Sequence, residues 1–125
     1  MVDDSIPEDV RDFILRHIDS VAQLEALLLL RANPQESWDV ARAARRLYTD
    51  EQQIAEVLGR LAEDGFLTVT DATYRFECQT PEQQAMVDRT AEVYRRQLIP
   101  VTNMIHAKPR RIRQFADAFK FKKDR

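Results

Sequence analysis

Apolar residues recur every three or four positions along most of this 125-residue chain, as one face of an α-helix requires. With the capping and stop residues, this spacing predicts five helices: from Ser5 to about Ile18, from Ser20 to Asn33, over residues 38–46, from Thr49 to Asp64, and over residues 81–107. The second helix is apolar around so much of its circumference that we expect protein to surround it. Two short runs rich in β-branched and aromatic residues, 66–70 and 73–78, predict a hairpin with its turn at Asp71-Ala72.

Most of the predicted helix starts carry a hydroxyl residue followed three positions later by Glu or Gln, the pattern of a capping box. These pairs are Ser5 with Glu8, Ser20 with Gln23, Thr49 with Gln52, and Thr80 with Gln83. Ser37 is expected to cap the helix over residues 38–46, and Gly65 to end the following helix in the left-handed conformation. Trp38 is predicted to be at least half buried, because its indole can fill the space left by small alanines nearby.

The stretch from Ser37 to Phe76 has the order of a helix-turn-helix followed by a wing. Its motifs Trp38-x-Val40, Leu58-x-x-Leu61-x-x-x-Gly65-Phe66-Leu67 and Tyr74-Arg75-Phe76 resemble the winged helix-turn-helix superfamily, and the resemblance covers about residues 20–78. The chain looks most like small bacterial winged-helix proteins without an assigned role. The resemblance implies a mainly α fold with a small β-hairpin wing, an extra N-terminal helix (1–19), a winged helix-turn-helix (20–79), a long C-terminal helix (80–107) and a basic tail (108–125). Winged helices bind DNA, RNA or proteins, so the fold by itself does not select a function.

The long C-terminal helix carries an apolar seam with nearly three heptads of a/d spacing. Its members are Val87, Ala91, Tyr94, Leu98, Val101 and Ile105. Pro100 predicts a kink or break between about Arg96 and Pro100, since proline removes a backbone donor and clashes with the preceding turn. Either the N-terminal helix or a second copy of the chain could cover the seam. The resemblance slightly favours a homodimer, because a long helix after the wing is a usual dimerisation element in winged-helix regulators.

Charge is distributed unevenly along the chain, whose overall net charge is −2. Residues 1–80 carry a net charge of −8 and residues 81–125 a net charge of +6, so an acidic body is followed by a basic tail. The longest apolar run is too short to span a bilayer, and the acidic N-terminus lacks the pattern of a secretion signal. We therefore expect a cytoplasmic protein.

The tail, residues 108–125, holds eight basic and two acidic residues. Ile112, Phe115, Ala116 and Phe119 would share one face of a helix. One interpretation is a closing helix that docks on the body. The other is an arm for a partner helix, for nucleic-acid phosphates or, least favoured, for a membrane surface.

No arrangement of residues typical of catalysis appears in the sequence. His17 and His106 are far apart and lack neighbouring ligands, the single Cys78 cannot form an internal disulfide, and two glycines cannot make a phosphate-binding loop. We read Cys78 as a semi-buried strand cysteine rather than a reactive thiol. The sequence predicts neither an enzyme nor a metal or cofactor site.

Two functional hypotheses remain, and they differ in what the third helix of the winged fold contacts. The first is a bacterial transcriptional regulator, dimeric through residues 81–107, that binds DNA. Thr49, Gln52, Gln53 and Arg60 would lie at the groove, and Arg42, Arg45, Arg46, Arg110, Arg111 and Arg113 on phosphates. The second is an interaction module that holds a basic protein surface, because Asp50, Glu51, Glu56, Glu63 and Asp64 would repel phosphates. A positive surface around Gln52 and Arg60 would favour the first, and a negative surface the second.

Overall fold

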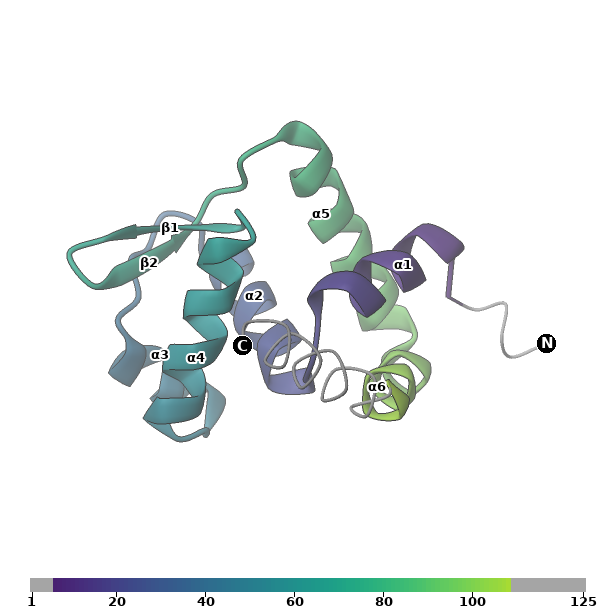
Figure 1. Cartoon of the computed structure of the whole chain (residues 1–125), viewed down its shortest axis with the longest axis horizontal. Coiled ribbons are helices and arrows are strands. Elements are labelled where there is room, and N and C mark those ends of the chain that lie inside the picture. Colours follow the sequence, from purple (N-terminus) through teal and green to yellow (C-terminus); the bar gives the residue numbers. More distant parts are fainter. Residues whose placement is uncertain (1–5, 109–125) are drawn as a thin grey trace, which may run out of the picture.

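A computed structural model describes residues 6–108 of the chain. Within that range the elements are α1 (Glu8–His17), α2 (Val21–Ala32), α3 (Val40–Leu47), α4 (Glu51–Glu63), β1 (Leu67–Thr70), β2 (Thr73–Phe76), α5 (Pro81–Arg96) and α6 (Leu98–Ala107). The fold is mainly helical with one antiparallel two-stranded sheet. Helix α2 lies in the middle, with α3, α4 and the hairpin to one side and α1, α5 and α6 to the other (Figure 1).

Helix α2 is surrounded as its sequence predicts. Leu24, Ala26, Leu27 and Leu30 are completely buried, and the helix packs against α3, α4, β2 and α6. Burial of each leucine side chain contributes roughly 1.5–3 kcal/mol to stability, because it removes apolar surface from water. Both halves of the described protein therefore share one hydrophobic core. No helix within residues 6–108 has the length and apolar character needed to cross a membrane.

Two of the predicted helix caps are confirmed. The Gln23 amide donates to Ser20 Oγ (3.1 Å) at the start of α2, and the Gln83 amide donates to Thr80 Oγ1 (3.1 Å) at the start of α5, whose first residue is Pro81. A third predicted cap, Ser5, lies outside the described residues. Helix α1 begins at Glu8 after Pro7, without a side-chain cap.

The predicted caps of α3 and α4 are wrong, by two residues and one residue. Asp39 caps α3 by accepting from the Arg42 amide (2.7 Å), and Asp50 caps α4 by accepting from the Gln53 amide (2.9 Å). Between Ser37 and this cap lies Trp38, which forms a β-bridge with Tyr74. The Thr49 hydroxyl instead donates to the Leu47 carbonyl (3.0 Å), at the end of α3.

The hairpin has the predicted turn, and its strands are shorter than predicted. Leu67 pairs with Phe76, and Thr70 with Thr73. Asp71 and Ala72 both have positive φ (50° and 65°), as a two-residue hairpin turn requires. Cys78 lies beyond β2 rather than in it.

Trp38 joins the hairpin and is fully buried, which confirms its predicted burial. Its amide donates to the Tyr74 carbonyl (2.8 Å), and the Tyr74 amide donates to the Trp38 carbonyl (2.7 Å). Trp38 precedes α3 and forms a β-bridge with Tyr74, so that it links the start of α3 to the hairpin.

Gly65 ends α4 in the left-handed conformation, with φ of 93°, as predicted. The Gly65 amide donates to the Ala62 carbonyl (3.0 Å) and the Phe66 amide to the Leu61 carbonyl (3.1 Å), which is the pattern of a Schellman motif. A Cβ atom at Gly65 would lie 2.8 Å from the Gln79 side chain. The backbone conformation therefore requires glycine here, whereas the end of the flexible Gln79 side chain could move to make room.

The long C-terminal helix is broken at Gln97, within the interval that Pro100 predicts. The apolar seam is largely covered by the chain itself, because Val87, Tyr94, Val101 and Ile105 are all buried. Leu98 stands at the break and is 49% exposed. A second copy is not needed to cover this seam, and the homodimer stays a prediction.

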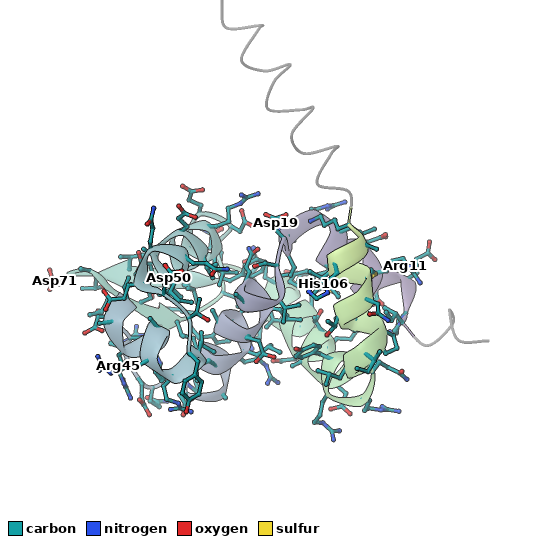
Figure 2. The ribbon with its side chains drawn as sticks, turned by 90° about the horizontal axis from the view of Figure 1, so that it is seen from below. Arg11, Asp19, Arg45, Asp50, Asp71 and His106 are labelled. Carbon is teal, nitrogen blue, oxygen red and sulfur yellow. The ribbon has the colours of Figure 1, made fainter. Side chains whose placement is uncertain are left out.

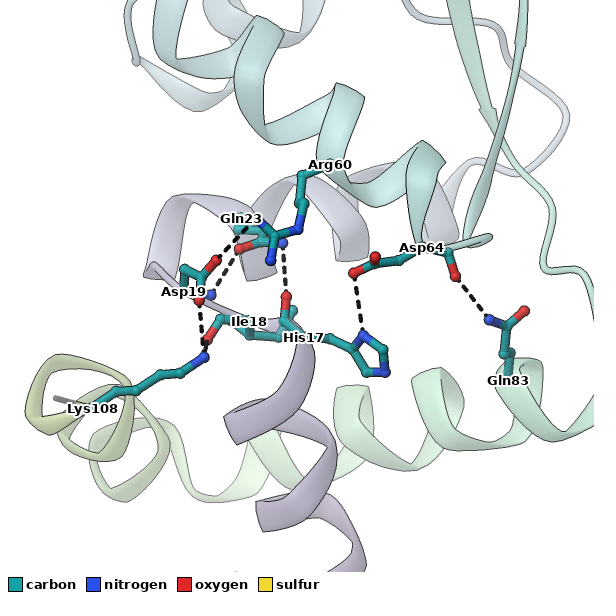
Figure 3. Close-up of polar contacts among 8 residues, drawn as sticks. All are labelled: His17, Ile18, Asp19, Gln23, Arg60, Asp64, Gln83 and Lys108. Carbon is teal, nitrogen blue, oxygen red and sulfur yellow. Dashed lines mark hydrogen bonds and ion pairs between the residues drawn. The ribbon is translucent and has the colours of Figure 1, made fainter. Parts of the chain in front are cut away.

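The last turn of α4 is tied by polar contacts to helices from the other half of the molecule (Figure 3). The ring of His17, at the end of α1, lies 3.2 Å from the Asp64 carboxylate, and Gln83 of α5 donates to the Asp64 carbonyl (2.9 Å). These contacts hold α4 in a fixed orientation relative to α1 and α5.

A second set of contacts surrounds Asp19, in the link between α1 and α2. Its carboxylate accepts from Lys108 Nζ (2.9 Å) and lies 3.7 Å from the Arg60 guanidinium of α4 (Figure 3). Lys108 also donates to the Ile18 carbonyl (2.9 Å). The end of α6 is thereby fastened beside the end of α1.

Candidate functional site: the α3–α4 face

Helix α3 carries only basic charges, and Trp38 orients two of them. The Arg42 guanidinium lies 3.9 Å from the centroid of the Trp38 ring, and that of Arg46 lies 5.8 Å from it. Arg42 also pairs with Glu36 and donates to the Ser37 carbonyl (3.1 Å). Stacking on an aromatic face favours the cation and limits its movement. Arg42 is thus largely engaged within the protein, whereas Arg45 and Arg46 are exposed.

Tyr48 ends α3 and is the functional candidate that the sequence analysis missed. The Thr49 amide donates to the Ala44 carbonyl (3.1 Å) and the Tyr48 amide to the Arg45 carbonyl (3.4 Å), so that Tyr48 occupies the left-handed position of a Schellman motif, with φ of 54°. Its side chain is 96% exposed. An exposed tyrosine beside two arginines combines the residue types that dominate binding interfaces. The sequence held one signal for this residue: no glycine stands at the end of α3, so a residue with a Cβ atom takes the left-handed position there.

The outward face of α4 is acidic. Ile54, Val57, Leu58 and Leu61 are buried against the rest of the protein. Opposite them along the helix lie Gln52, Glu56, Gly59 and Glu63, which we call the α4 ridge. All its members except the partly exposed Gly59 are exposed. Asp50 and Glu51 add two exposed carboxylates at the start of the helix.

Arg60 is not part of the α4 ridge. It lies on the flank of α4 that faces α2, where it pairs with Asp19 at 3.7 Å. Gln53 lies on the same flank and lines, with Arg60 and Glu56, a pocket of about 230 Å³. The only cation of α4 therefore points toward the α1–α2 link, which leaves the α4 ridge without a positive charge of its own.

The predicted nucleic-acid residues fall into three groups. Arg45, Arg46, Gln52 and Gln53 are exposed, whereas Arg42, Thr49 and Arg60 make contacts within the protein. The third group, Arg110, Arg111 and Arg113, lies outside the described residues. Arg45, Asp50 and Asp71 mark the half of the molecule that contains α3, α4 and the hairpin, well away from Arg11 and His106 (Figure 2).

Three side chains among the described residues have shifted pKa values, and none lies on the α3–α4 face. A hydrogen bond from Arg95 lowers the pKa of Glu92 on α5. Burial, reinforced by the nearby Asp88, raises the pKa of Cys78 to about 11. Burial and a hydrogen bond to Glu25 (2.6 Å) raise the pKa of Tyr94 to about 12. Both groups stay protonated at neutral pH, so the Cys78 thiol is a poor nucleophile.

The two histidines lie in different surroundings. His17 packs against Phe13 and Phe66, with ring centroids 5.2 and 5.3 Å away, and His106 is exposed on α6. Among residues 6–108, no group of three or more His, Cys, Asp or Glu side chains is placed to hold a metal ion.

These features define a mainly helical protein with a small antiparallel hairpin and two adjacent, oppositely charged helices on one face. Comparison with known proteins gave no match to any family model, curated protein or solved structure.

Proposed function

We propose that residues 20–78 form a winged-helix domain that acts as a protein–protein interaction module, with the α4 ridge as the contact surface for a basic region of another protein. The order α2, α3, α4, β1, β2 and the buried Trp38 support the winged-helix assignment.

The charge of the α4 ridge is the observation that carries this proposal. Glu56 and Glu63 project outward from α4 with Asp50 and Glu51 at its start, while Arg60 pairs with Asp19 on the flank. Placed in a major groove, this helix would bring carboxylates close to phosphates. Lysine and arginine side chains of a protein partner would instead find complementary charge, which speeds association and fixes the orientation of binding.

Gly59 adds a steric feature to the α4 ridge. A Cβ atom at this position would meet nothing within 4 Å, so packing inside the chain does not require glycine. A glycine in a helix interior costs about 0.8–1 kcal/mol relative to alanine. Its benefit on an exposed ridge is that a partner backbone can approach α4 closely.

Site-specific photo-cross-linking tests the proposed surface. A photoreactive amino acid replaces Gln52 in cells that make the protein, and the control carries it at exposed Arg95 on α5, in the other half of the molecule. We expect a protein cross-link from position 52 that position 95 does not give. The cross-linked peptide of the partner should be rich in lysine and arginine.

Charge reversal tests whether the α4 ridge supplies the attraction. Glu56→Lys should weaken binding of the cross-linked partner by about tenfold or more, since one repulsive pair in place of an attractive one costs at least ~1.4 kcal/mol. Glu92→Lys on α5 introduces the same change of charge away from the surface and should leave affinity unchanged. Equal losses in the two variants would contradict the assignment of the surface.

DNA binding is the second candidate, and the end of α3 favours it. Arg45, Arg46 and Tyr48 are exposed together, and Trp38 holds Arg42 beside them. In this hypothesis the arginines contact phosphates, and Gln52 and Gln53 reach base edges from the start of α4.

Fluorescence anisotropy with genomic duplex fragments at 50 and 150 mM salt separates the two candidates. If the protein is an interaction module, we expect no preference among the DNA fragments and little effect of Gln53→Ala on DNA binding. Three results together would identify the regulator as the correct function. One fragment binds specifically, Gln53→Ala lowers the preference for that fragment, and Arg45→Ala weakens binding to all fragments and reduces its salt dependence.

A further inference from the structure

A pocket of about 350 Å³ lies between α1 and the first turns of α5, away from the α4 ridge. Phe13, Phe66 and Met86 form its apolar floor. The rings of Phe13 and Phe66 meet edge to face with centroids 5.5 Å apart, and the His17 ring packs against both. Such a floor suits an aromatic side chain.

The rim of this pocket is mainly acidic. Asp9, Asp12 and Glu82 line it, against one arginine, Arg16. Asp9 pairs with Arg89 (2.7 Å), whereas Asp12 and Glu82 are exposed and form no ion pair within residues 6–108. An aromatic floor beneath unpaired carboxylates fits a segment that combines aromatic and basic residues.

The chain itself contains such a segment. Residues 109–125 hold seven basic and two acidic residues together with Phe115, Phe119 and Phe121. The three phenylalanines need apolar surface to cover them, and the cations need negative charge nearby.

The start of this segment is fixed beside the C-terminal end of α1. Lys108 donates to the Ile18 carbonyl and to Asp19 (both 2.9 Å), directly after His17, which lines the pocket (Figure 3). As a helix, the 17 residues from 109 to 125 would span roughly 25 Å, and the ten residues of α1 span about 15 Å. The segment is long enough to run along α1 and over the whole pocket.

We propose that residues 109–125 dock onto this pocket in the same chain. Phe115 and Phe119 occupy the floor formed by Phe13, Phe66 and Met86, and the flanking cations lie beside Asp12 and Glu82. The tail then serves as an intramolecular latch across α1 and α5, and its aromatic residues are withdrawn from solvent.

Methyl NMR of the full-length chain tests the latch, because two methionines report on different places. Met86 lines the pocket, and Met104 of α6 contacts Arg11 elsewhere on α1. In protein with ¹³C-labelled methionine methyl groups, we expect nuclear Overhauser effects from phenylalanine ring protons of the tail to Met86 and none to Met104. Phe115→Ala with Phe119→Ala should remove those effects and shift the Met86 signal only.

Charge reversal and mixed labelling complete the test. Asp12→Lys with Glu82→Lys should reproduce the change at Met86, whereas Glu56→Lys on α4 should leave it unaltered. A sample that mixes methionine-labelled chains with phenylalanine-labelled chains detects a tail that docks on another copy. The proposal would be overturned if the nuclear Overhauser effects arise only between copies, or if the Met86 signal is unchanged in the tail variants.

Discussion

Helices α3 and α4 begin and end with the same capping motifs, but their exposed surfaces carry opposite charge. Each is capped by an aspartate, Asp39 or Asp50, and each ends in a Schellman motif. The left-handed position is an enclosed glycine in α4 (Gly65) and an exposed tyrosine in α3 (Tyr48). Helix α3 carries only basic charges, and the α4 ridge carries only acidic ones.

This difference shows which features of the two helices serve folding and which are free for binding. Gly65 is required by its φ of 93°, which a residue with a Cβ atom rarely adopts, and the nearby end of the Gln79 side chain would also have to move. Tyr48 has an unfavourable φ of 54°, although its exposed side chain makes no packing contact that would require a tyrosine here. Backbone strain at an exposed position is a pointer to function rather than to packing.

The largest effect is expected from Trp38→Ala, which removes the aromatic ring that lies against the Arg42 and Arg46 guanidinium groups of α3. The indole is fully buried, so we expect a loss of roughly 3–5 kcal/mol in the free energy of unfolding, even though the backbone bonds to Tyr74 can remain. Urea denaturation followed by far-ultraviolet circular dichroism measures the loss, since Trp38 is the only tryptophan. A loss below about 1 kcal/mol would mean that α3 does not depend on this contact.

Gly65→Ala should destabilise the protein by roughly 1–3 kcal/mol. The left-handed conformation costs a residue with a Cβ atom about 1 kcal/mol or more, and the clash at 2.8 Å with Gln79 adds to it. Gly65→Ala with Gln79→Ala relieves the clash and should recover only part of the loss. Complete recovery would show that backbone conformation contributes nothing at this position.

Gly59→Ala is the matched substitution on the exposed side of α4, and it should act in the opposite direction. The new methyl group meets no neighbour, so the gain in helix propensity should raise the free energy of unfolding by roughly 0.5–1 kcal/mol. Binding of the α4 partner should weaken at the same time, if that partner lies close to the helix backbone. An unchanged affinity would place the partner away from the middle of the α4 ridge.

The smallest effect is expected from Tyr48→Gly, the counterpart of Gly65 in α3. Glycine relieves the positive φ, and the exposed ring makes little contact with the protein, so we expect a gain of up to about 1 kcal/mol in stability. Thermal unfolding measures the gain, and Tyr48→Asn should give a smaller one. A loss of stability would mean that the ring packs on the protein, and a loss of partner or DNA binding would identify Tyr48 as a contact residue.

Much of the fold was predictable because it depends on local signals. The periodicity located α1, α2 and α5, and the turn residues located the hairpin, each close to its observed bounds. The site was less predictable. The sequence predicted Arg60 at a DNA groove, but its partner Asp19 is distant in the sequence and could not be inferred from spacing.

The sequence by itself determined where helices and strands form, where α4 must end and where the C-terminal helix must break. These features follow from side-chain spacing and from the restricted φ angles of glycine and proline, which act within one or two turns of backbone. Only the tertiary structure decided that Trp38 pairs with Tyr74, that Arg60 leaves the α4 ridge, and that the seam of α5 and α6 is covered within one chain. Each of these depends on a contact between residues far apart in sequence, such as Arg60 with Asp19, and a linear pattern carries no information about which distant surface a side chain meets.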